Sequence, residues 1–110
     1  MVRITEQART QYLQLLRWYL GEGRPQAARN LEAAYGVAVE RIESSPAASM
    51  AFPRPYPSLA RYGFHWIKEH RYWFAFANHE EHGLVITNVF NETADMPGRV
   101  SENDEPAYEA

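Results

Sequence analysis

His65 is the residue of this chain best suited to acid–base chemistry. A histidine has an ordinary pKa of about 6.5, so its imidazole can take up and release a proton near neutral pH. Arg71 and Arg99 could supply positive charge beside it if the fold brings the three together. They form a candidate catalytic set. The alternative is that His65 makes a structural hydrogen bond while both arginines pair with Glu92 or Asp95.

The stretch NVFNETADMPGR, residues 88 to 99, is a second candidate region. It follows an apolar run and carries Asn88, Asn91, acidic residues and a late arginine. An asparagine does not titrate near neutral pH and cannot carry a proton from one group to another. The stretch is therefore a site of another kind, the relic of a catalytic site, or only the rim of a sheet.

The stretch HEEH, residues 79 to 82, carries types of ligand that zinc accepts. His79 and His82 are three residues apart, and Glu80 lies between them. The segment reads as a hairpin turn before Gly83, where polar side chains simply meet water, and no further histidine or cysteine lies at ligand spacing. We therefore expect no metal site, and we expect no cofactor.

Two helices should precede these residues. Thr5 could cap the first, in which apolar residues recur at helical spacing and Trp18 is expected in the core or at an interface. GEGRP, residues 21 to 25, breaks the pattern, and Pro25 fits the first turn of a second helix. That helix has an alanine-rich apolar stripe, which lets two antiparallel helices approach closely, and it ends at residues 44 to 46.

A sheet should follow the helices. Residues 46 to 63 include PRPYP, which predicts a stiff, extended crossover, with a proline-motif ligand for another protein as the alternative. Residues 2 to 4 are a short β-prone start. Three strands with a period of two are predicted at FHWI (64–67), RYWFAFAN (71–78) and LVITNVF (84–90). The fold class is α+β, an N-terminal antiparallel helical hairpin packed on one face of a small antiparallel sheet.

The composition fits one small domain. The chain has 110 residues, of which 45% are apolar, and a net charge of −3. Residues 101 to 110 hold four acids and no base, which leaves eleven bases against ten acids in residues 1 to 100. We expect a single domain over residues 1–100 and an acidic, disordered tail over 101–110. We also expect a cytoplasmic protein without a membrane span and without strong nucleic-acid binding.

The order of elements and two motifs resemble the RelE/ParE superfamily of bacterial toxin–antitoxin toxins, in particular the plasmid-stabilisation proteins. Members carry a helical hairpin, a Pro-rich crossover, Gly-x-Arg before an "RY" strand, and a last strand that ends like Val-Leu-His-Glu-Arg-x-Asp-Ile-Pro-x-Arg. Here the corresponding stretches read GFHWIKEHRYWFAFA and VFNETADMPGR. The best matches are Gly63, Arg71, Tyr72, Val89, Glu92, Asp95, Pro97 and Arg99. The resemblance covers nearly the whole domain and implies the RelE/ParE-like fold.

Four departures from the family pattern bear on activity. His65 stands for an arginine after the glycine and Ala77 for the arginine at the end of the central strand. In the final motif Asn91 stands for the histidine and Thr93 for the arginine two residues later. Ribonuclease members cut mRNA on the ribosome, which needs a base, an acid and cations for the phosphate charge. The resemblance therefore implies a toxin fold without the usual nuclease residues.

The first hypothesis is a ParE-like toxin that inhibits growth by binding a cellular target and is neutralised by a cognate antitoxin. DNA gyrase, the target in relatives, and the ribosome are the candidate targets, and the antitoxin would lay an apolar helix or strand over the sheet and helices. The contact residues that the resemblance implies are Tyr72, Asn88, Asn91, Glu92, Asp95 and Arg99. One alternative is a RelE-like ribosome-dependent mRNA endonuclease that uses His65 with Arg71 and Arg99. Another is a non-toxic descendant that only binds a partner.

Overall fold

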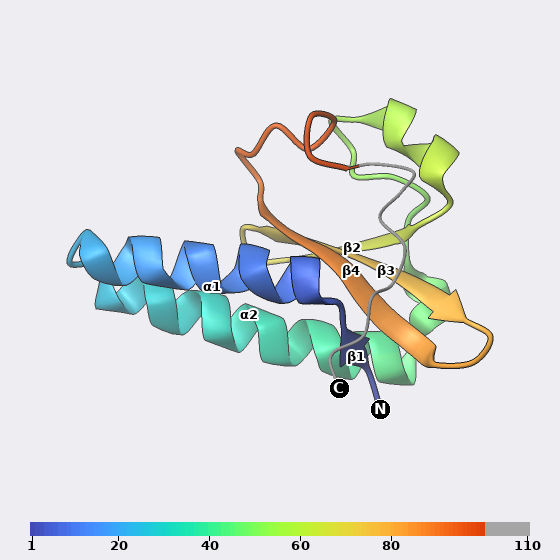
Figure 1. Ribbon diagram of the computed structural model, residues 1–110, viewed down its shortest axis with the longest axis horizontal. Helices are drawn as coiled ribbons and strands as arrows, with labels where there is room; N and C mark the ends of the chain where they lie inside the picture. The colour runs from blue at the N-terminus through green and yellow to red at the C-terminus, as the bar shows by residue number, and fades with distance from the viewer. Residues whose placement is uncertain (101–110) are drawn as a thin grey trace.

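Two long antiparallel helices lie across one face of a four-stranded sheet (Figure 1). The computed structural model describes residues 1–100, so the tail predicted for residues 101–110 lies outside the described residues. The elements are β1 (Arg3–Ile4), α1 (Glu6–Gly21), α2 (Pro25–Ser44), the 3₁₀ helices η1 (Pro46–Ala48) and η2 (Pro57–Tyr62), β2 (His65–Glu69), β3 (Tyr72–His79) and β4 (Gly83–Asn91). The predicted α+β class is confirmed, and both long helices precede the strands β2, β3 and β4.

The sheet has the strand order β1-β4-β3-β2. β2, β3 and β4 form the predicted antiparallel meander. The prediction of a purely antiparallel sheet is wrong, because β1 pairs with β4 in parallel and the Thr5 N–H donates to the Ile86 carbonyl at 3.0 Å. A two-residue strand that pairs with residues some eighty positions away leaves no periodic pattern in the sequence.

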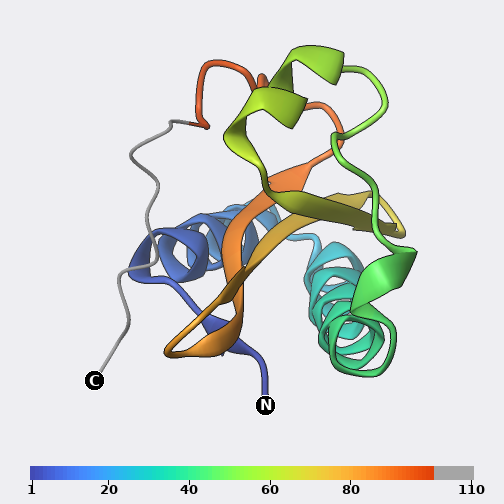
Figure 2. The same ribbon diagram turned by 90° about the vertical axis from the view of Figure 1, so that its right-hand side faces the viewer.

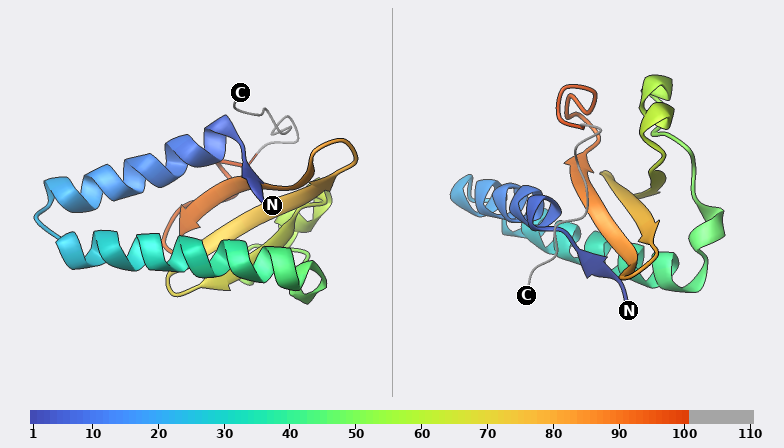
Figure 3. Two further views of the ribbon diagram at one scale, coloured as in Figure 1. Left: turned by 90° about the horizontal axis from the view of Figure 1, so that it is seen from below. Right: turned by 45° about the vertical axis from the view of Figure 1, so that its right-hand side comes forward.

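The helical hairpin has the ends that the sequence predicts. Thr5 caps α1, and its Oγ1 accepts a hydrogen bond from the Ala8 N–H at 3.1 Å. Gly23 has a φ of 68° in the turn, and Pro25 is the first residue of α2. Figure 3 shows the two helices running side by side in opposite directions beneath the sheet. No helix within residues 1–100 is both long enough and apolar enough to span a membrane.

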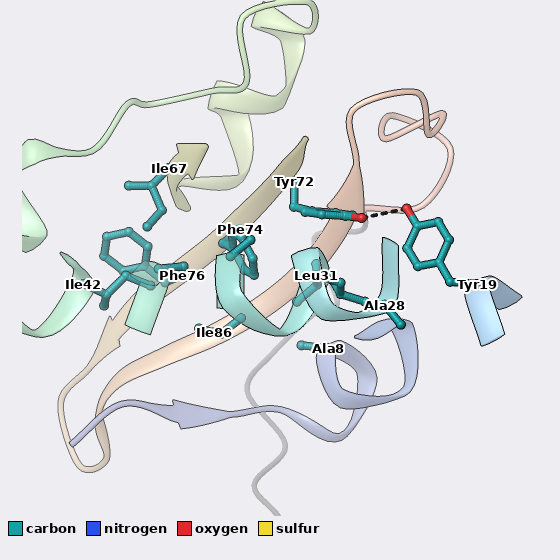
Figure 4. Close-up of a cluster of buried hydrophobic side chains, with 13 residues drawn as sticks. Ala8, Tyr19, Ala28, Leu31, Ile42, Ile67, Tyr72, Phe74, Phe76 and Ile86 are labelled. Carbon is teal, nitrogen blue, oxygen red and sulfur yellow. Dashed lines mark hydrogen bonds between the residues drawn. The ribbon is translucent and has the colours of Figure 1, made fainter. Parts of the chain in front are cut away.

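The first core lies between the hairpin and the sheet (Figure 4). On β3, Tyr72, Phe74 and Phe76 point toward the helices, as their alternation predicts. Phe74 is completely buried, and its ring meets the ring of Tyr35 edge-on at 6.2 Å. The small buried side chains of α2 bring its backbone close to these aromatic rings; they include Ala28, Ala34 and Ala38.

The other face of the sheet is buried too, which the sequence interpretation missed. Figure 2 shows residues 46–63 and the segment after β4 on the side of the sheet opposite the helices. The second core consists of Leu59, Trp66, Trp73, Ala75, Phe90, Met96 and Val100. Residues 46–63 therefore do not form a plain extended crossover, because they contain two 3₁₀ helices and cover a sheet face. The unbroken apolar run of β3 is the sequence signal for a strand buried on both faces.

Candidate functional site

His65 and Arg71 lie at opposite ends of β2. His65 begins the strand and pairs with Phe76, whose ring centroid is 5.3 Å from its own. Its Nδ1 is 3.4 Å from the Ser49 Oγ. β2 ends at Glu69, four positions after His65, which at about 3.3 Å per residue is about 13 Å along the strand, and Arg71 lies in the turn beyond it. His65 therefore cannot act on a group that Arg71 holds, and within residues 1–100 its polar contact is the structural one with Ser49.

Arg99 also lies away from His65. It follows β4 in a turn in which its N–H donates to the Met96 carbonyl at 3.0 Å. Its side chain lines a groove together with Asn91, which ends β4 opposite Tyr72. That is the sheet end away from the pairing of His65 with Phe76. The structure thus does not bring the three candidate catalytic residues into one site.

Glu92 is the ionic centre at this end of the sheet. Its Oε1 is 3.1 Å from the Lys68 Nζ, and its Oε2 is 4.0 Å from the Arg71 Nε. Its N–H also donates to the Arg71 carbonyl at 2.8 Å. All three side chains are more than a third exposed, so each ion pair contributes less than about 1 kcal/mol. The structure therefore contains the Arg71–Glu92 ion pair that was the alternative to a catalytic role for Arg71, and Lys68 forms a second ion pair with the same carboxylate.

Asn91 ties the end of β4 to the helical hairpin. Its Oδ1 accepts hydrogen bonds from the N–H and the hydroxyl of Thr93, at 3.0 and 2.9 Å. Its Nδ2 donates to the Tyr19 hydroxyl at 3.0 Å, and that hydroxyl is 2.7 Å from the Tyr72 hydroxyl (Figure 4). Asn91 therefore uses both ends of its amide in structural bonds. This side chain therefore holds the end of β4 against the hairpin.

Tyr72 stays a neutral hydroxyl at any physiological pH. Burial raises its pKa well above the ordinary value of 10, and the hydrogen bond with Tyr19 raises it further. The nearby guanidinium groups of Arg24 and Arg71 lower that pKa, but by less. Only 2% of Tyr72 is exposed, so a partner protein does not touch it without a change of conformation.

Asn88 and Asp95 differ sharply in accessibility. Asn88 is completely buried opposite Ala75, beside an irregularity in the β3–β4 register. Within residues 1–100 neither polar atom of its side chain has a hydrogen-bond partner, and the same holds for the indole nitrogen of Trp66. Asp95 is exposed in the turn after β4, where its carboxylate lies over Gly98. Of these two candidates, only Asp95 is accessible to a partner.

The groove that contains Arg99 runs between α1 and the end of β4 and has a volume of about 140 Å³. We call it the Trp18–Arg99 groove; its other lining residues are Gln11, Gln14, Leu15, Val89, Phe90, Asn91 and Ala94. Trp18 is 55% exposed, so this large apolar residue lies at the surface and not in the core. Gln11, Leu15 and Trp18 share one helix face at i, i+4 and i+7, which is the signal that could have grouped them.

The HEEH stretch forms the turn between β3 and β4, as predicted. The rings of His79 and His82 are 4.9 Å apart, and the His79 Nδ1 accepts a hydrogen bond from the Glu81 N–H at 3.2 Å. Within residues 1–100 no group of three His, Asp or Glu side chains could hold a metal ion. His79 therefore acts as part of the turn.

Comparison with known proteins does not assign this chain to a family. No protein-family model, no curated protein and no solved structure matches it. The proposal of a function therefore rests on the residues, on the geometry of the fold and on the RelE/ParE resemblance of the sequence.

Proposed function

We propose that the chain is a ParE-like toxin of a bacterial type II toxin–antitoxin system that inhibits growth by binding a cellular target. In ParE relatives the target is DNA gyrase. The observation that carries the proposal is that Trp18 and Arg99 line the same groove. Tryptophan and arginine are among the residue types that dominate binding energy at protein interfaces. Arg99 also belongs to the motif that resembles the family.

The chemistry of the groove defines the surface of the partner. Arg99 is the only charged residue among the described residues that line the groove, and Trp18 presents a large exposed ring beside it. A partner with a carboxylate opposite Arg99 and an apolar side chain against Trp18 would complement both.

The separation of His65 from Arg71 and Arg99 supports binding over RNA cleavage. A general base must lie within hydrogen-bond reach of its proton, and cations must surround the same phosphate. Here about 13 Å of strand separates His65 from Glu69, beyond which Arg71 lies, and the Asn91 amide is engaged at both its oxygen and its nitrogen in structural bonds. The RelE-like endonuclease hypothesis would require a rearrangement of β2.

The sheet is covered on both faces and along its edges, which limits how a cognate antitoxin could bind. Both faces are covered by the chain itself, and at the outer edge of β2 Met50 exchanges two backbone hydrogen bonds of 2.8 Å with Trp66. At the opposite edge β1 pairs with only two residues of β4, and further along Thr5 and Gln11 occupy the β4 backbone: the Thr5 Oγ1 donates to the Thr87 carbonyl at 3.4 Å, and the Val89 N–H donates to the Gln11 Oε1 at 2.8 Å. An added strand has little edge to pair with, so we propose that the antitoxin lays an apolar helix in the Trp18–Arg99 groove and along α1.

Replacement of Arg99 by alanine tests this function. Induction of the unaltered chain should arrest bacterial growth, and Arg99→Ala at the same soluble level should not, because the charged anchor of the groove is gone. Arg17→Ala is the matched control, since Arg17 is exposed on α1 and lies outside the groove lining. Growth curves after controlled induction measure the effect. Equal arrest by all three chains would contradict the proposal, and so would the absence of arrest by the unaltered chain.

A further inference from the structure

A cavity of about 480 Å³ lies between the α1–α2 turn and the β2–β3 turn. It shares no lining residue with the Trp18–Arg99 groove, so what it binds does not depend on the proposed toxin function. Arg24, His70 and Arg71 line it from the two turns, and none of its described lining residues is acidic. The wall of the cavity therefore attracts negative charge.

The first turn of α2 forms part of this wall. Pro25 has no N–H, and the Ala28 N–H already donates to the Arg24 carbonyl at 3.2 Å. The N–H groups of Gln26 and Ala27 have no acceptor within the helix, because they belong to its first turn. Arg24, at the N-cap, gives no side-chain hydrogen bond, and the first turn has no acidic residue. The positive end of a 20-residue helix thus faces the cavity uncapped.

The tyrosine pair supplies a hydroxyl donor beside this wall. Tyr19 and Tyr72 both line the cavity, are only 3% and 2% exposed, and lie with their hydroxyl oxygens 2.7 Å apart. If Tyr72 donates to Tyr19, the Tyr19 oxygen accepts from both Tyr72 and Asn91, and its own proton has no acceptor within residues 1–100. If Tyr19 donates to Tyr72, the Tyr72 proton has none. Either way the pair uses one of its two O–H protons, and the other can donate to a ligand in the cavity.

The two guanidinium groups are held at the cavity by different contacts. The Arg24 Cζ lies 5.2 Å from the ring centroid of Tyr19 and 5.8 Å from that of Trp18, and within residues 1–100 Arg24 forms no ion pair. Arg71 is 4.0 Å from Glu92, a carboxylate that is closer to Lys68. Both arginines line the cavity together with Tyr72. The positive charge of the two arginines is therefore only partly neutralised by carboxylates of residues 1–100 and can attract an anionic ligand.

We propose that this cavity binds the phosphate group of a small phosphomonoester. A tetrahedral phosphate has enough oxygens to accept from Arg24, from Arg71, from the first turn of α2 and from the free tyrosine proton together. A planar carboxylate has only two oxygens for these donors. The cavity volume exceeds that of a phosphate group and lies in the range of sites for small molecules, so an organic part can also enter.

Isothermal titration of the full 110-residue chain with phenyl phosphate tests the site. Saturable binding is expected, and Arg24→Gln and Arg71→Gln should each weaken it at least about tenfold, because each removes charge-assisted hydrogen bonds. Arg29→Gln is the matched control, since Arg29 lies on the same helix but does not line the cavity. All three positions are exposed, so the variants should fold.

Three further titrations at constant ionic strength decide the ligand class. Inorganic phosphate should bind the same site, and the ratio of its dissociation constant to that of phenyl phosphate tells whether the cavity favours the free anion or the ester. Acetate and chloride should bind at least tenfold more weakly than either. The proposal is overturned if acetate binds as tightly as phosphate, if Arg29→Gln weakens binding as much as Arg24→Gln, or if neither phosphate compound binds.

Discussion

Replacement of Phe74 by alanine is expected to lower the free energy of unfolding by about 3–5 kcal/mol. Phe74 is completely buried in the middle of β3, where it pairs with Ile67 on one side and Val89 on the other. Its ring also meets Tyr35 of α2, so the substitution leaves a cavity at the junction of the sheet and the hairpin. Urea unfolding followed by circular dichroism measures the loss.

Tyr62→Ala is the contrast for this measurement, because Tyr62 is an aromatic residue of η2 that is only partly buried against the second core. Its loss should be clearly smaller, on the order of 1–2 kcal/mol. Equal losses at the two positions would mean that the helices do not cover the sheet through Phe74.

Replacement of Trp18 by alanine is expected to raise the amount of protein needed for growth arrest by about 30-fold or more. The reason is that a central aromatic residue of an interface typically contributes 2 kcal/mol or more to binding, which corresponds to about that factor in affinity. Trp18 is more than half exposed, so its loss should leave the stability of the fold nearly unchanged. The measurement is the soluble protein level at which the growth rate falls by half.

Val37→Ala is the matched control for Trp18→Ala. Val37 is also an exposed apolar residue, at 43%, but it lies on α2 and does not line the Trp18–Arg99 groove. Its substitution should leave the arresting level within about twofold of the unaltered chain, as for a residue outside an interface. A similar loss of potency in both variants would point to a general effect of surface hydrophobicity and against the groove.

The local features of the fold could be predicted from the sequence because each has a local physical cause. Thr5 caps α1 through a bond three residues away, Pro25 opens α2, and the alternation of Tyr72 and Trp73 assigns them to opposite faces. The pairing of β1 with β4 and the burial of the second face depend on long-range contacts. No repeat in the sequence encodes the position of residues 92–100 over Trp73.

The candidate site also combines features that the sequence predicts with features that only the fold shows. The sequence offers the pairing of Arg71 with Glu92 as an alternative, because opposite charges near strand ends commonly meet. The distance between His65 and Arg71 follows only from the β2–β3 register, which the sequence does not reveal. The groove is lined by both Trp18 and Arg99, which lie about eighty residues apart in the sequence. Only the folded chain brings them together, so no motif search could have paired them.

The central claim, that this fold acts by binding and not by acid–base cleavage of RNA, is tested most directly with His65. Growth and transcript integrity should be measured together after induction of the unaltered chain and of His65→Ala at matched soluble levels. We predict that both chains arrest growth and that mapped mRNA 5′ ends match those of uninduced cells. Loss of arrest in His65→Ala, or new transcript ends that appear only with the unaltered chain, would contradict the account.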